Sequence, residues 1–337
     1  MKIGILSFSE KGFALAKRLS GFFEDGGDFV SYKRAESGEL SPWTKEHFFS
    51  DDAIIYISSC GIALRGVAPF VKSKTTDPAV VVIDECGTFA VSLLSGHIGG
   101  ANALAAKAAK FICAMPVITT ATDRNGVFAF DSWASANGLT VANPERIKWV
   151  SAKMLAGETV KIKSSFPIEG PLPEGTELAE ENYDVLITYR SRGKGDALRL
   201  VPKLVSLGIG CKKNISAEAI EEAFAAALKK SGCHPAAIKQ VCSIDLKAQE
   251  PGILSFCKEH GFDFITFSAN QLIDVPGSFT SSAFVKSVTG VDNVCERSAV
   301  LGSGENGKLI SQKDAGNGIT MALGIEPYTV RFFNENK

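Results

Sequence analysis

The chain has 337 residues, a length typical of about two globular domains. Hydrophobic residues make up 45% of the chain and charged residues 22%, a composition that excludes a mainly disordered protein. The 36 basic residues nearly balance the 37 acidic ones, so no excess positive charge is left to hold a phosphate backbone, and we expect no nucleic-acid partner.

The first part of the chain alternates short apolar runs with helical patterns. The predicted strands cover residues 3–8, 53–58, 80–84, 88–94 and 116–119. The predicted helices between them cover residues 10–23, 61–72 and 100–112. Because the strands are apolar throughout, they indicate a mostly parallel sheet that is covered on both faces. Residues 1–140 are therefore predicted to form an N-terminal α/β domain.

Residues 141–195 form a predicted middle segment of different character. Its predicted elements are one helix and two strands, over residues 143–155, 159–162 and 184–189. The stretch 166–182 is rich in proline, glycine and glutamate, which predicts a surface loop. Residues 191–200 have the composition of a linker.

Residues 196–330 are predicted to form a second α/β domain. A strand and a glycine turn over residues 201–210 precede a helix over residues 216–231, for which Ser216 is a suitable N-cap. The later predicted elements are two helices, one strand and a final pair of strands, over residues 247–260, 281–300, 263–267 and 308–324. The predicted fold class is thus α/β, with two main domains of mostly parallel sheets and a small middle segment.

The eight cysteines are scattered along the chain, and none stands in a C-x-x-C pair. This spacing gives no support to a zinc ribbon or a thioredoxin-like redox site. The chain turns polar after about six residues, too early for a secretory signal. No apolar run approaches the roughly 20 residues that a membrane helix needs. We therefore expect a cytoplasmic protein with reduced cysteines and no membrane partner.

Polar clusters follow several of the predicted strands between residues 60 and 123. The first holds the cations Arg65, Lys72 and Lys74, which could clamp a carboxylate or could simply line a solvated helix face. The second is the pair Asp84 and Glu85 at the end of a strand. Ligands of open α/β sheets gather beyond the carboxyl ends of strands, although an acidic pair there can equally cap a turn.

The third cluster is the loop before an alanine-rich helix, with Ser95, Gly96, His97, Gly99, Gly100 and Asn102. The glycines allow close approach of a ligand, and the helix start presents N–H groups that suit an anion or an oxyanion. An imidazole is the side chain best matched to proton transfer near neutral pH, so His97 is a candidate acid or base. The alternative is a capping or structural histidine. The spacing matches no nucleotide-binding fingerprint.

Further candidates follow later strands. Thr119, Thr120 and Asp123 end the next apolar run and could hydrogen-bond a polar ligand. In the second domain the candidates are Gly208, Gly210, Lys212 and Glu296. A dinucleotide site would need a third glycine where Lys213 stands, and Cys211 has no histidine near it in sequence to make it a nucleophile.

Several long segments resemble a known family. GIALRGVAPFVKSKTTDPAVVVIDECGTFAVSLLSGHIGGANALA and PVITTATD closely resemble the N-terminal region of the cobalamin-biosynthesis family CbiG. LVSLGIGCKKNIS, SIDLKAQE, VDNVCERSAVL and KLISQK resemble its C-terminal domain. The resemblance runs from about residue 50 to about residue 323, with a poorly matching middle that is typical of the family. It implies a cobalt-precorrin-5A hydrolase of the anaerobic cobalamin pathway.

The reaction that the resemblance implies opens a δ-lactone on a cobalt-bound tetrapyrrole and releases the C-20 fragment as acetaldehyde, giving cobalt-precorrin-5B. It requires a group that activates water, groups that stabilise the oxyanion, and a group that transfers a proton as the carbon–carbon bond breaks. We expect His97 to act as acid or base, with Asp84, Glu85 or Asp123 to orient it or to act as the base. The other candidates are expected to bind the substrate, with the cations facing its carboxylates. The cobalt belongs to the substrate, so we expect no cofactor and no protein-held metal.

Two alternatives stay open. A non-catalytic tetrapyrrole carrier of the same pathway would bind the macrocycle without releasing acetaldehyde. A nucleotide-dependent α/β enzyme such as a dehydrogenase would need a fingerprint that the sequence lacks. For either enzyme or carrier, a transient hand-off to neighbouring pathway enzymes is conceivable, and the sequence does not determine the oligomeric state.

Overall fold

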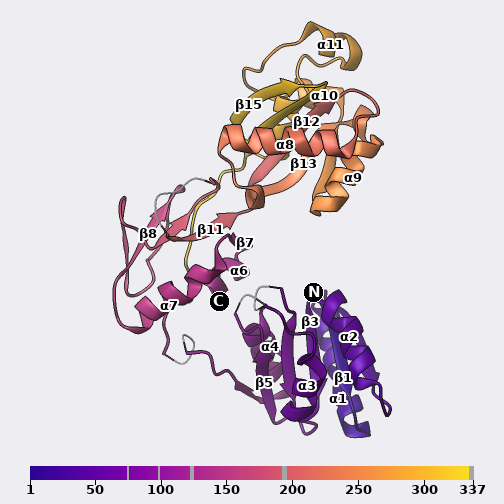
Figure 1. Ribbon diagram of the computed structural model, residues 1–337, viewed down its shortest axis with the longest axis vertical. Coiled ribbons are helices and arrows are strands. Elements are labelled where there is room, and N and C mark those ends of the chain that lie inside the picture. Colours follow the sequence, from indigo (N-terminus) through magenta and orange to yellow (C-terminus); the bar gives the residue numbers. More distant parts are fainter. Residues whose placement is uncertain (74–75, 98, 122–124, 192–195, 334–337) are drawn as a thin grey trace. The chain divides into compact units, whose positions relative to one another are not determined.

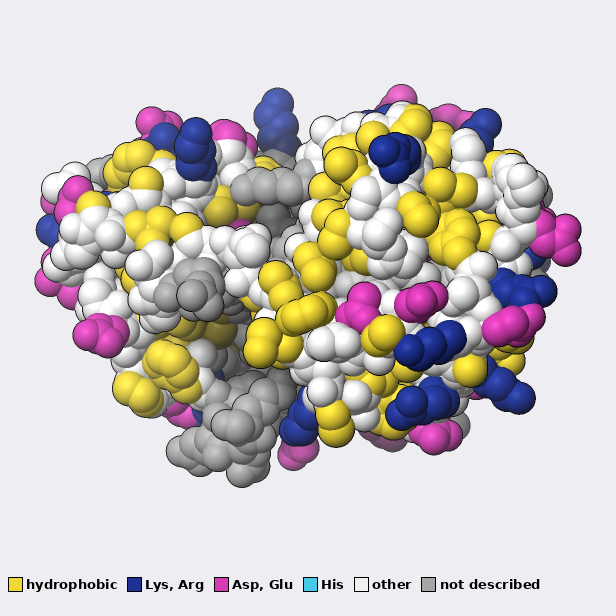
Figure 2. All heavy atoms as spheres, turned by 90° about the horizontal axis from the view of Figure 1, so that it is seen from below, with side chains coloured by type: hydrophobic (Ala, Val, Ile, Leu, Met, Phe, Trp, Pro, Cys, Tyr) yellow, Lys and Arg dark blue, Asp and Glu magenta, His cyan; other side chains and the backbone are white. Residues whose placement is uncertain are grey.

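The computed structural model describes residues 1–73, 76–97, 99–121, 125–191 and 196–333 (Figure 1). The chain divides into two compact units. One consists of Met1–Asn137 with Ser151–Glu158, and the other of Gly138–Val150 with Thr159–Lys337. No described helix is long and apolar enough to cross a membrane. Basic and acidic side chains lie near one another on the surface shown in Figure 2, as the near-balance of charge in the sequence leads one to expect.

The N-terminal unit holds a six-stranded sheet of order β2-β1-β3-β4-β5-β6. Its strands are β1 (Lys2–Ser7), β2 (Phe29–Arg34), β3 (Ala53–Ile57), β4 (Ala79–Ile83), β5 (Phe89–Leu94) and β6 (Met115–Val117). The helices along it are α1 (Glu10–Asp25), α2 (Leu40–Ser50), α3 (Cys60–Val67) and α4 (Ala101–Ile112). The helix predicted over residues 61–72 ends earlier than expected, at Val67.

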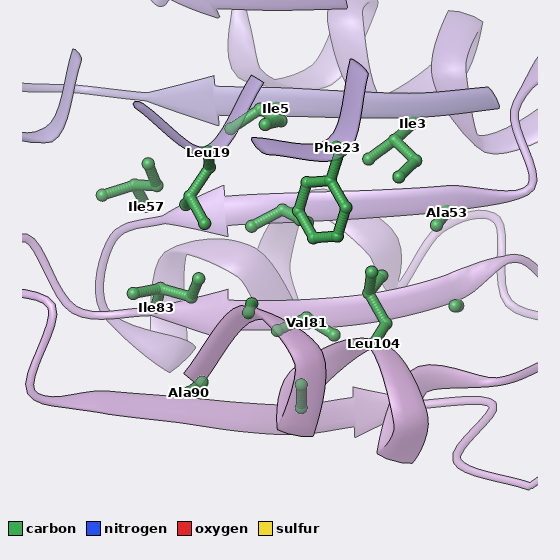
Figure 3. Close-up of a cluster of buried hydrophobic side chains, with 14 of the residues drawn as sticks. Ile3, Ile5, Leu19, Phe23, Ala53, Ile57, Val81, Ile83, Ala90 and Leu104 are labelled. Atoms are coloured by element: carbon green, nitrogen blue, oxygen red, sulfur yellow. The ribbon is translucent and has the colours of Figure 1, made fainter. Parts of the chain in front are cut away.

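Both faces of this sheet are buried, which explains why its central strands are apolar throughout. On one face, Ile3, Ile5 and Val81 pack against α1 and α4 through side chains such as Phe23 and Leu104 (Figure 3). The intervening strand residues, Leu6, Ile54 and Tyr56 among them, pack with side chains of α2 and α3 on the other face. Since successive side chains of a strand point to opposite faces, each central strand contributes residues to both hydrophobic cores.

One connection breaks the expected parallel order. Strands β1 to β4 are parallel, but β5 pairs antiparallel with β4 and parallel with β6. Figure 3 shows the strand of Ala90 running opposite to the strand of Val81 and Ile83. The loop from Ile83 to Phe89 is too short for a crossover helix, so only a hairpin can join the two strands.

The reversal separates the strand ends of the sheet into two edges. The carboxyl ends of β1, β3 and β4 lie together at one end of the parallel strands. We call this end of the sheet the switch-point edge, since the chain turns to opposite faces of the sheet after β1 and after β3. The carboxyl ends of β5 and β6 lie at the opposite edge, here called the histidine edge because His97 follows β5.

A second, smaller sheet occupies the middle of the chain, in the order β7-β11-β10-β8-β9. Its strands are β7 (Leu139–Val141), β8 (Val160–Ser164), β9 (Thr176–Leu178), β10 (Val185–Ile187) and β11 (Leu198–Pro202). The helices before and after β7 in the chain are α6 (Phe130–Ala136) and α7 (Ile147–Leu155), the latter preceded by a 3-10 turn over Pro144–Arg146. Two expectations are wrong here: the predicted loop 166–182 contains β9, and the predicted linker 191–200 runs into β11.

The C-terminal sheet has the order β14-β13-β12-β16-β15. Its strands are β12 (Val205–Cys211), β13 (Ile238–Ile244), β14 (Asp263–Phe267), β15 (Lys308–Gly316) and β16 (Ile319–Ile325). Its helices are α8 (Ala217–Ser231), α9 (Pro251–His260), α10 (Ala269–Ile273), α11 (Ala283–Thr289) and α12 (Cys295–Gly302). Ser216 caps α8 as predicted, its hydroxyl accepting the N–H of Ala219.

The single helix predicted over residues 281–300 is instead two helices. Gly290 ends α11 with a φ of +79°, a left-handed conformation that stops a helix, and α12 starts only at Cys295. The mostly parallel α/β class is otherwise confirmed, since β12, β13 and β14 are parallel to one another. The domain boundaries at residues 140 and 195 remain a prediction about which parts fold independently.

Candidate functional site

The histidine edge brings together His97 and a buried acid. Nδ1 of His97 lies 3.3 Å from Oδ2 of Asp131, in the first turn of α6. The His97 side chain is 16% exposed and that of Asp131 is 4% exposed, so a ligand can reach the imidazole while the carboxylate stays behind it. A proton held on Nδ1 by the carboxylate leaves the lone pair on Nε2, the tautomer that accepts a proton there. The distance is long for such a bond, and bonds of this kind tighten when substrate binds.

The loop that carries His97 has a strained start and a tightly packed end. Ser95 adopts a φ of +57°, uncommon for a residue with a side chain. A Cβ on Gly99 would stand 2.4 Å from the Cβ of Ser95, so only glycine fits there. A Cβ on Gly96 would likewise stand 2.7 Å from Oδ1 of Asn102. These two glycines are needed to fold the loop around Ser95 and Asn102, whatever their role toward a ligand.

The start of α4 offers fewer anion-binding groups than the sequence suggested. The N–H of Gly100 donates to the carbonyl of His97, and the N–H groups of Ala101 and Asn102 donate to the carbonyls of Ser95 and Gly96. These three donors therefore stabilise the loop itself. The N–H of Gly100 is therefore not available to an oxyanion, which corrects the role expected of Gly100.

Asn102 links the loop to the end of β6. Its Nδ2 donates to Oγ1 of Thr120 at 2.9 Å, so the two predicted residues do meet at the histidine edge. Thr119, next to Thr120, is exposed. Lys74 and Asp123, both expected at the site, lie outside the described residues.

Two buried oxygens at this edge have unused hydrogen-bonding capacity. Oγ of Ser95 and Oδ1 of Asp131 are both inaccessible to solvent, and neither has a hydrogen-bond partner among the described residues. Leaving such atoms unpaired is costly, and each calls for an explanation such as a water, an ion, a ligand or local strain.

Asp84 and Glu85 lie at the opposite, switch-point edge. The Asp84 carboxylate accepts three backbone N–H groups, from Cys86, Thr88 and Phe89, and so closes the β4–β5 hairpin. Glu85 accepts the hydroxyl of Ser9 at 2.7 Å. The expectation that either residue orients His97 is corrected, because the hairpin reversal sends the end of β4 away from the end of β5.

The expected cationic clamp is also divided. The Arg65 guanidinium turns back toward Gly61 at the start of α3, which follows the switch-point end of β3. The Lys72 ammonium instead stands 5.5 Å from the Phe49 ring, beside the end of α2. The two cations are directed to opposite edges and cannot grip one carboxylate together.

Three of the predicted residues of the second domain, Gly208, Gly210 and Glu296, have structural roles. A Cβ on Gly208 would stand 1.9 Å from the carbonyl oxygen of Cys295, and one on Gly210 would stand 2.6 Å from Oγ1 of Thr320, so both glycines let neighbours pack closely on β12. Glu296 is only 1% exposed and is saturated with hydrogen bonds, which corrects its expected role as a ligand contact. Lys212, by contrast, follows β12 at the surface.

Asp131 is a candidate site residue that the sequence analysis missed. It stands 34 residues after His97, so no local spacing connects the two. The available signal is its setting, an acid among Phe128, Phe130 and Trp133, because an acid surrounded by aromatic residues is buried and needs a partner.

Comparisons with known proteins agree with this organisation. The family model described as Cobalamin synthesis G N-terminal matches residues 42–123, and Cobalamin synthesis G C-terminus matches residues 205–324. The first match contains the His97 loop, and the second covers the C-terminal sheet.

Full-length relatives are also found. A curated cobalt-precorrin-5A hydrolase from Salmonella typhimurium is 33% identical, over 96% of this chain and 97% of the relative. Another from Priestia megaterium is 31% identical, over 91% of this chain and 87% of the relative. The crystal structure of a cobalamin biosynthesis protein G homolog from Sulfolobus solfataricus is 25% identical, covers 96% of this chain and 97% of its own, and gives a TM-score of 0.42.

Proposed function

The chain belongs to the CbiG family of cobalt-precorrin-5A hydrolases, and from this membership we propose that its His97 loop opens the δ-lactone of cobalt-precorrin-5A. The protein is a hydrolase of cobalamin biosynthesis, as its relatives are. The observation that carries the assignment of the site is the pairing of a partly exposed imidazole with a buried carboxylate, His97 with Asp131.

His97 would act first as a general base. Asp131 holds the proton on Nδ1, and Nε2 takes a proton from a water that attacks the lactone carbonyl. The new C–O bond forms a tetrahedral oxyanion, and its collapse breaks the lactone C–O bond. The imidazolium then returns its proton to the departing oxygen, which restores neutral His97 and leaves a hydroxyl and a carboxylic acid that loses its proton to solvent.

The oxyanion needs donors other than the start of α4. The polar side chains beside the loop are Asn102 and Thr120, already aligned by their hydrogen bond. We assign the stabilisation of the oxyanion to them. Loss of the C-20 fragment as acetaldehyde then requires a base that removes the proton of the released hydroxyl while the carbon–carbon bond breaks and its electron pair passes to the macrocycle. We assign this role to the same imidazole.

The accompanying assignments follow from the same proposal. The cobalt enters and leaves as part of the substrate, the protein holds no cofactor of its own, and the reaction takes place in the cytoplasm. The substrate is a small molecule, and neither nucleic acid nor membrane takes part. Product passes to the next pathway enzyme by a transient encounter.

The test is incubation with enzymatically prepared cobalt-precorrin-5A, with released acetaldehyde trapped as a hydrazone. The wild type should release acetaldehyde, and His97→Ala should release it about 10²–10⁴-fold more slowly, the usual loss for a general base. Binding of the tetrapyrrole without any acetaldehyde would instead identify a carrier. Full turnover by His97→Ala would place the chemistry elsewhere.

A further inference from the structure

Helix α11 presents an apolar face that no described part of the chain covers. Phe284 is 76% exposed and Val288 is 62% exposed, four residues apart and therefore on one side of the helix. Val285, on another side, packs against the core formed by Ile244 and Leu272. The helix is thus anchored by one face while another offers large hydrophobic side chains to solvent, a pattern that marks interaction sites.

This face lies at the carboxyl edge of the C-terminal sheet. Val294, just before α12, stands beside Gly210 near the end of β12, and Gly302, at the end of α12, stands beside Ser206 near its start. Helix α12 therefore runs antiparallel to β12. The segment between β14 and α12, which contains α10 and α11, must lie beyond the carboxyl ends of the parallel strands, as Figure 1 shows. Ligands of such sheets bind at this edge.

The same edge carries cations that no described carboxylate neutralises. Lys212 and Lys213 directly follow β12, and Lys286 belongs to α11. None of the three forms an ion pair with an acid in the part of the chain that the structure describes. Lys212 is also held in place: its N–H donates to the carbonyl of Gly318, and its stem lies against that glycine, which has no room for a Cβ.

The segment that presents α11 is firmly attached to the domain. The buried Glu296 carboxylate accepts the N–H and hydroxyl of Thr280 at 2.7 and 2.9 Å, and Nδ2 of Asn293 at 2.8 Å. Arg297 donates to three carbonyls at the end of α10 and lies 4.6 Å from the Phe279 ring. These contacts fix α11 in its exposed position, so the exposed face is a built feature of the fold.

We propose that this edge, with Phe284, Val288, Lys212 and Lys213, is the docking surface for the tetrapyrrole macrocycle. The inference rests on the proposed function, which supplies the ligand class. A cobalt tetrapyrrole presents a flat apolar ring with ionised carboxylates around its rim. The ring matches the exposed face of α11, and the rim matches the lysines that lack acidic partners. Charge complementarity favours this occupant over a second copy of the chain, whose surface is nearly neutral overall.

The experiment measures binding of cobyrinic acid, a stable cobalt corrinoid with free carboxylates, to the full chain by absorbance titration. Phe284→Ser should raise the Kd at least about tenfold, the usual effect of removing an aromatic anchor. Lys212→Glu should raise it by a similar factor and flatten its salt dependence. The matched control is Phe29→Ser, since Phe29 is 79% exposed on β2 of the other unit, and it should leave the Kd unchanged.

The outcomes separate this inference from the proposed function. If the wild type binds and all three variants bind equally well, or if the wild type does not bind at all, the docking surface is wrong, whatever the acetaldehyde assay shows. If Phe284→Ser changes the sedimentation of the protein but not the Kd, the face is a contact between copies, which also overturns the inference. Weakened binding together with a raised KM and an unchanged kcat for cobalt-precorrin-5A supports it.

Discussion

Nδ1 of His97 and Oδ2 of Asp131 lie 3.3 Å apart, although one follows β5 and the other opens α6. The second oxygen of Asp131 has no described partner. Among the described residues, the side chain that this carboxylate faces is the His97 imidazole. The importance of this contact is best tested by a substitution that removes the charge of Asp131 and keeps the shape of its side chain.

Asp131→Asn keeps the shape of the side chain and removes its charge. We expect kcat for acetaldehyde release to fall about 10²–10⁴-fold, because the amide can hold the wrong tautomer of His97. The double variant with His97→Ala should be no slower than the slower single variant, since the two residues act as one unit. Melting temperatures, measured alongside, should stay near that of the wild type. Multiplicative losses in the double variant would show that Asp131 acts independently of His97.

Gly99→Ala and Gly100→Ala form a matched pair. A Cβ on Gly99 collides with Ser95, whereas one on Gly100 meets nothing within 4 Å and is opposed only by a φ of +85°. We expect Gly100→Ala to cost roughly 1–2 kcal/mol of unfolding free energy and to keep most activity. Gly99→Ala should displace the loop and lose activity at least about a hundredfold. Urea unfolding and the acetaldehyde assay measure the two effects, and equal behaviour of the variants would contradict the assigned crowding.

Glu296→Ala tests the attachment of α11. The carboxylate accepts four hydrogen bonds while only 1% exposed, and its loss leaves their donors unpaired. We expect a loss of about 3–5 kcal/mol in unfolding free energy, measured by urea denaturation. Glu259→Ala, at an exposed position of α9, is the control and should change stability by less than about 0.5 kcal/mol. A small effect at Glu296 would mean that the segment is held by other contacts.

The cysteines should separate into reactive and protected groups. Burial raises the pKa of Cys233, Cys242 and Cys257 to about 12 and that of Cys295 to about 11, so these thiols stay neutral and unreactive near pH 8. The exposed thiols, Cys60, Cys86 and Cys113, should be alkylated by iodoacetamide in the folded protein. Intact-mass measurement with and without urea checks this. Alkylation of a buried thiol before unfolding would contradict the burial.

The stability of the N-terminal unit should depend on pH through Asp51. Burial alone would raise the pKa of Asp51, but hydrogen bonds from His47, Ser50 and Lys2 outweigh it and hold the pKa below its ordinary value. A lowered pKa adds stability above the unfolded value, and that stability disappears as the pH falls through the folded value. Urea midpoints of the wild type and Asp51→Asn should therefore differ at pH 6, and the difference should shrink as the pH falls from about 3.9 through the lower folded pKa of Asp51. Asp25→Asn, at the exposed end of α1, should show no such gap.

Most of the N-terminal sheet could be predicted because strands such as β3 and β4 are buried on both faces and are apolar at every position. Strand β2 was missed for the opposite reason, since at the sheet edge five of its six residues are exposed and its apolar pattern is lost. The hairpin after β4 escaped prediction because a run of apolar residues does not encode strand direction. Because the reversal was not predicted, Asp84 and Glu85 were expected at the wrong end of the sheet. Asp131 was missed because its contact with His97 is tertiary and leaves no local sequence pattern.

The hairpin reversal also decides which helix ends lie at the edge that carries the His97 loop. Helices α1, α2 and α3 follow strands that end at the switch-point edge, so all three arrive at the histidine edge with their C-termini, whereas α4 and α6 begin there. Each C-terminus contributes about half a negative elementary charge through its macrodipole. Among the described helices, three C-termini and two N-termini thus place partial charges of both signs at this edge, so the main chain alone favours neither an anionic nor a cationic ligand there.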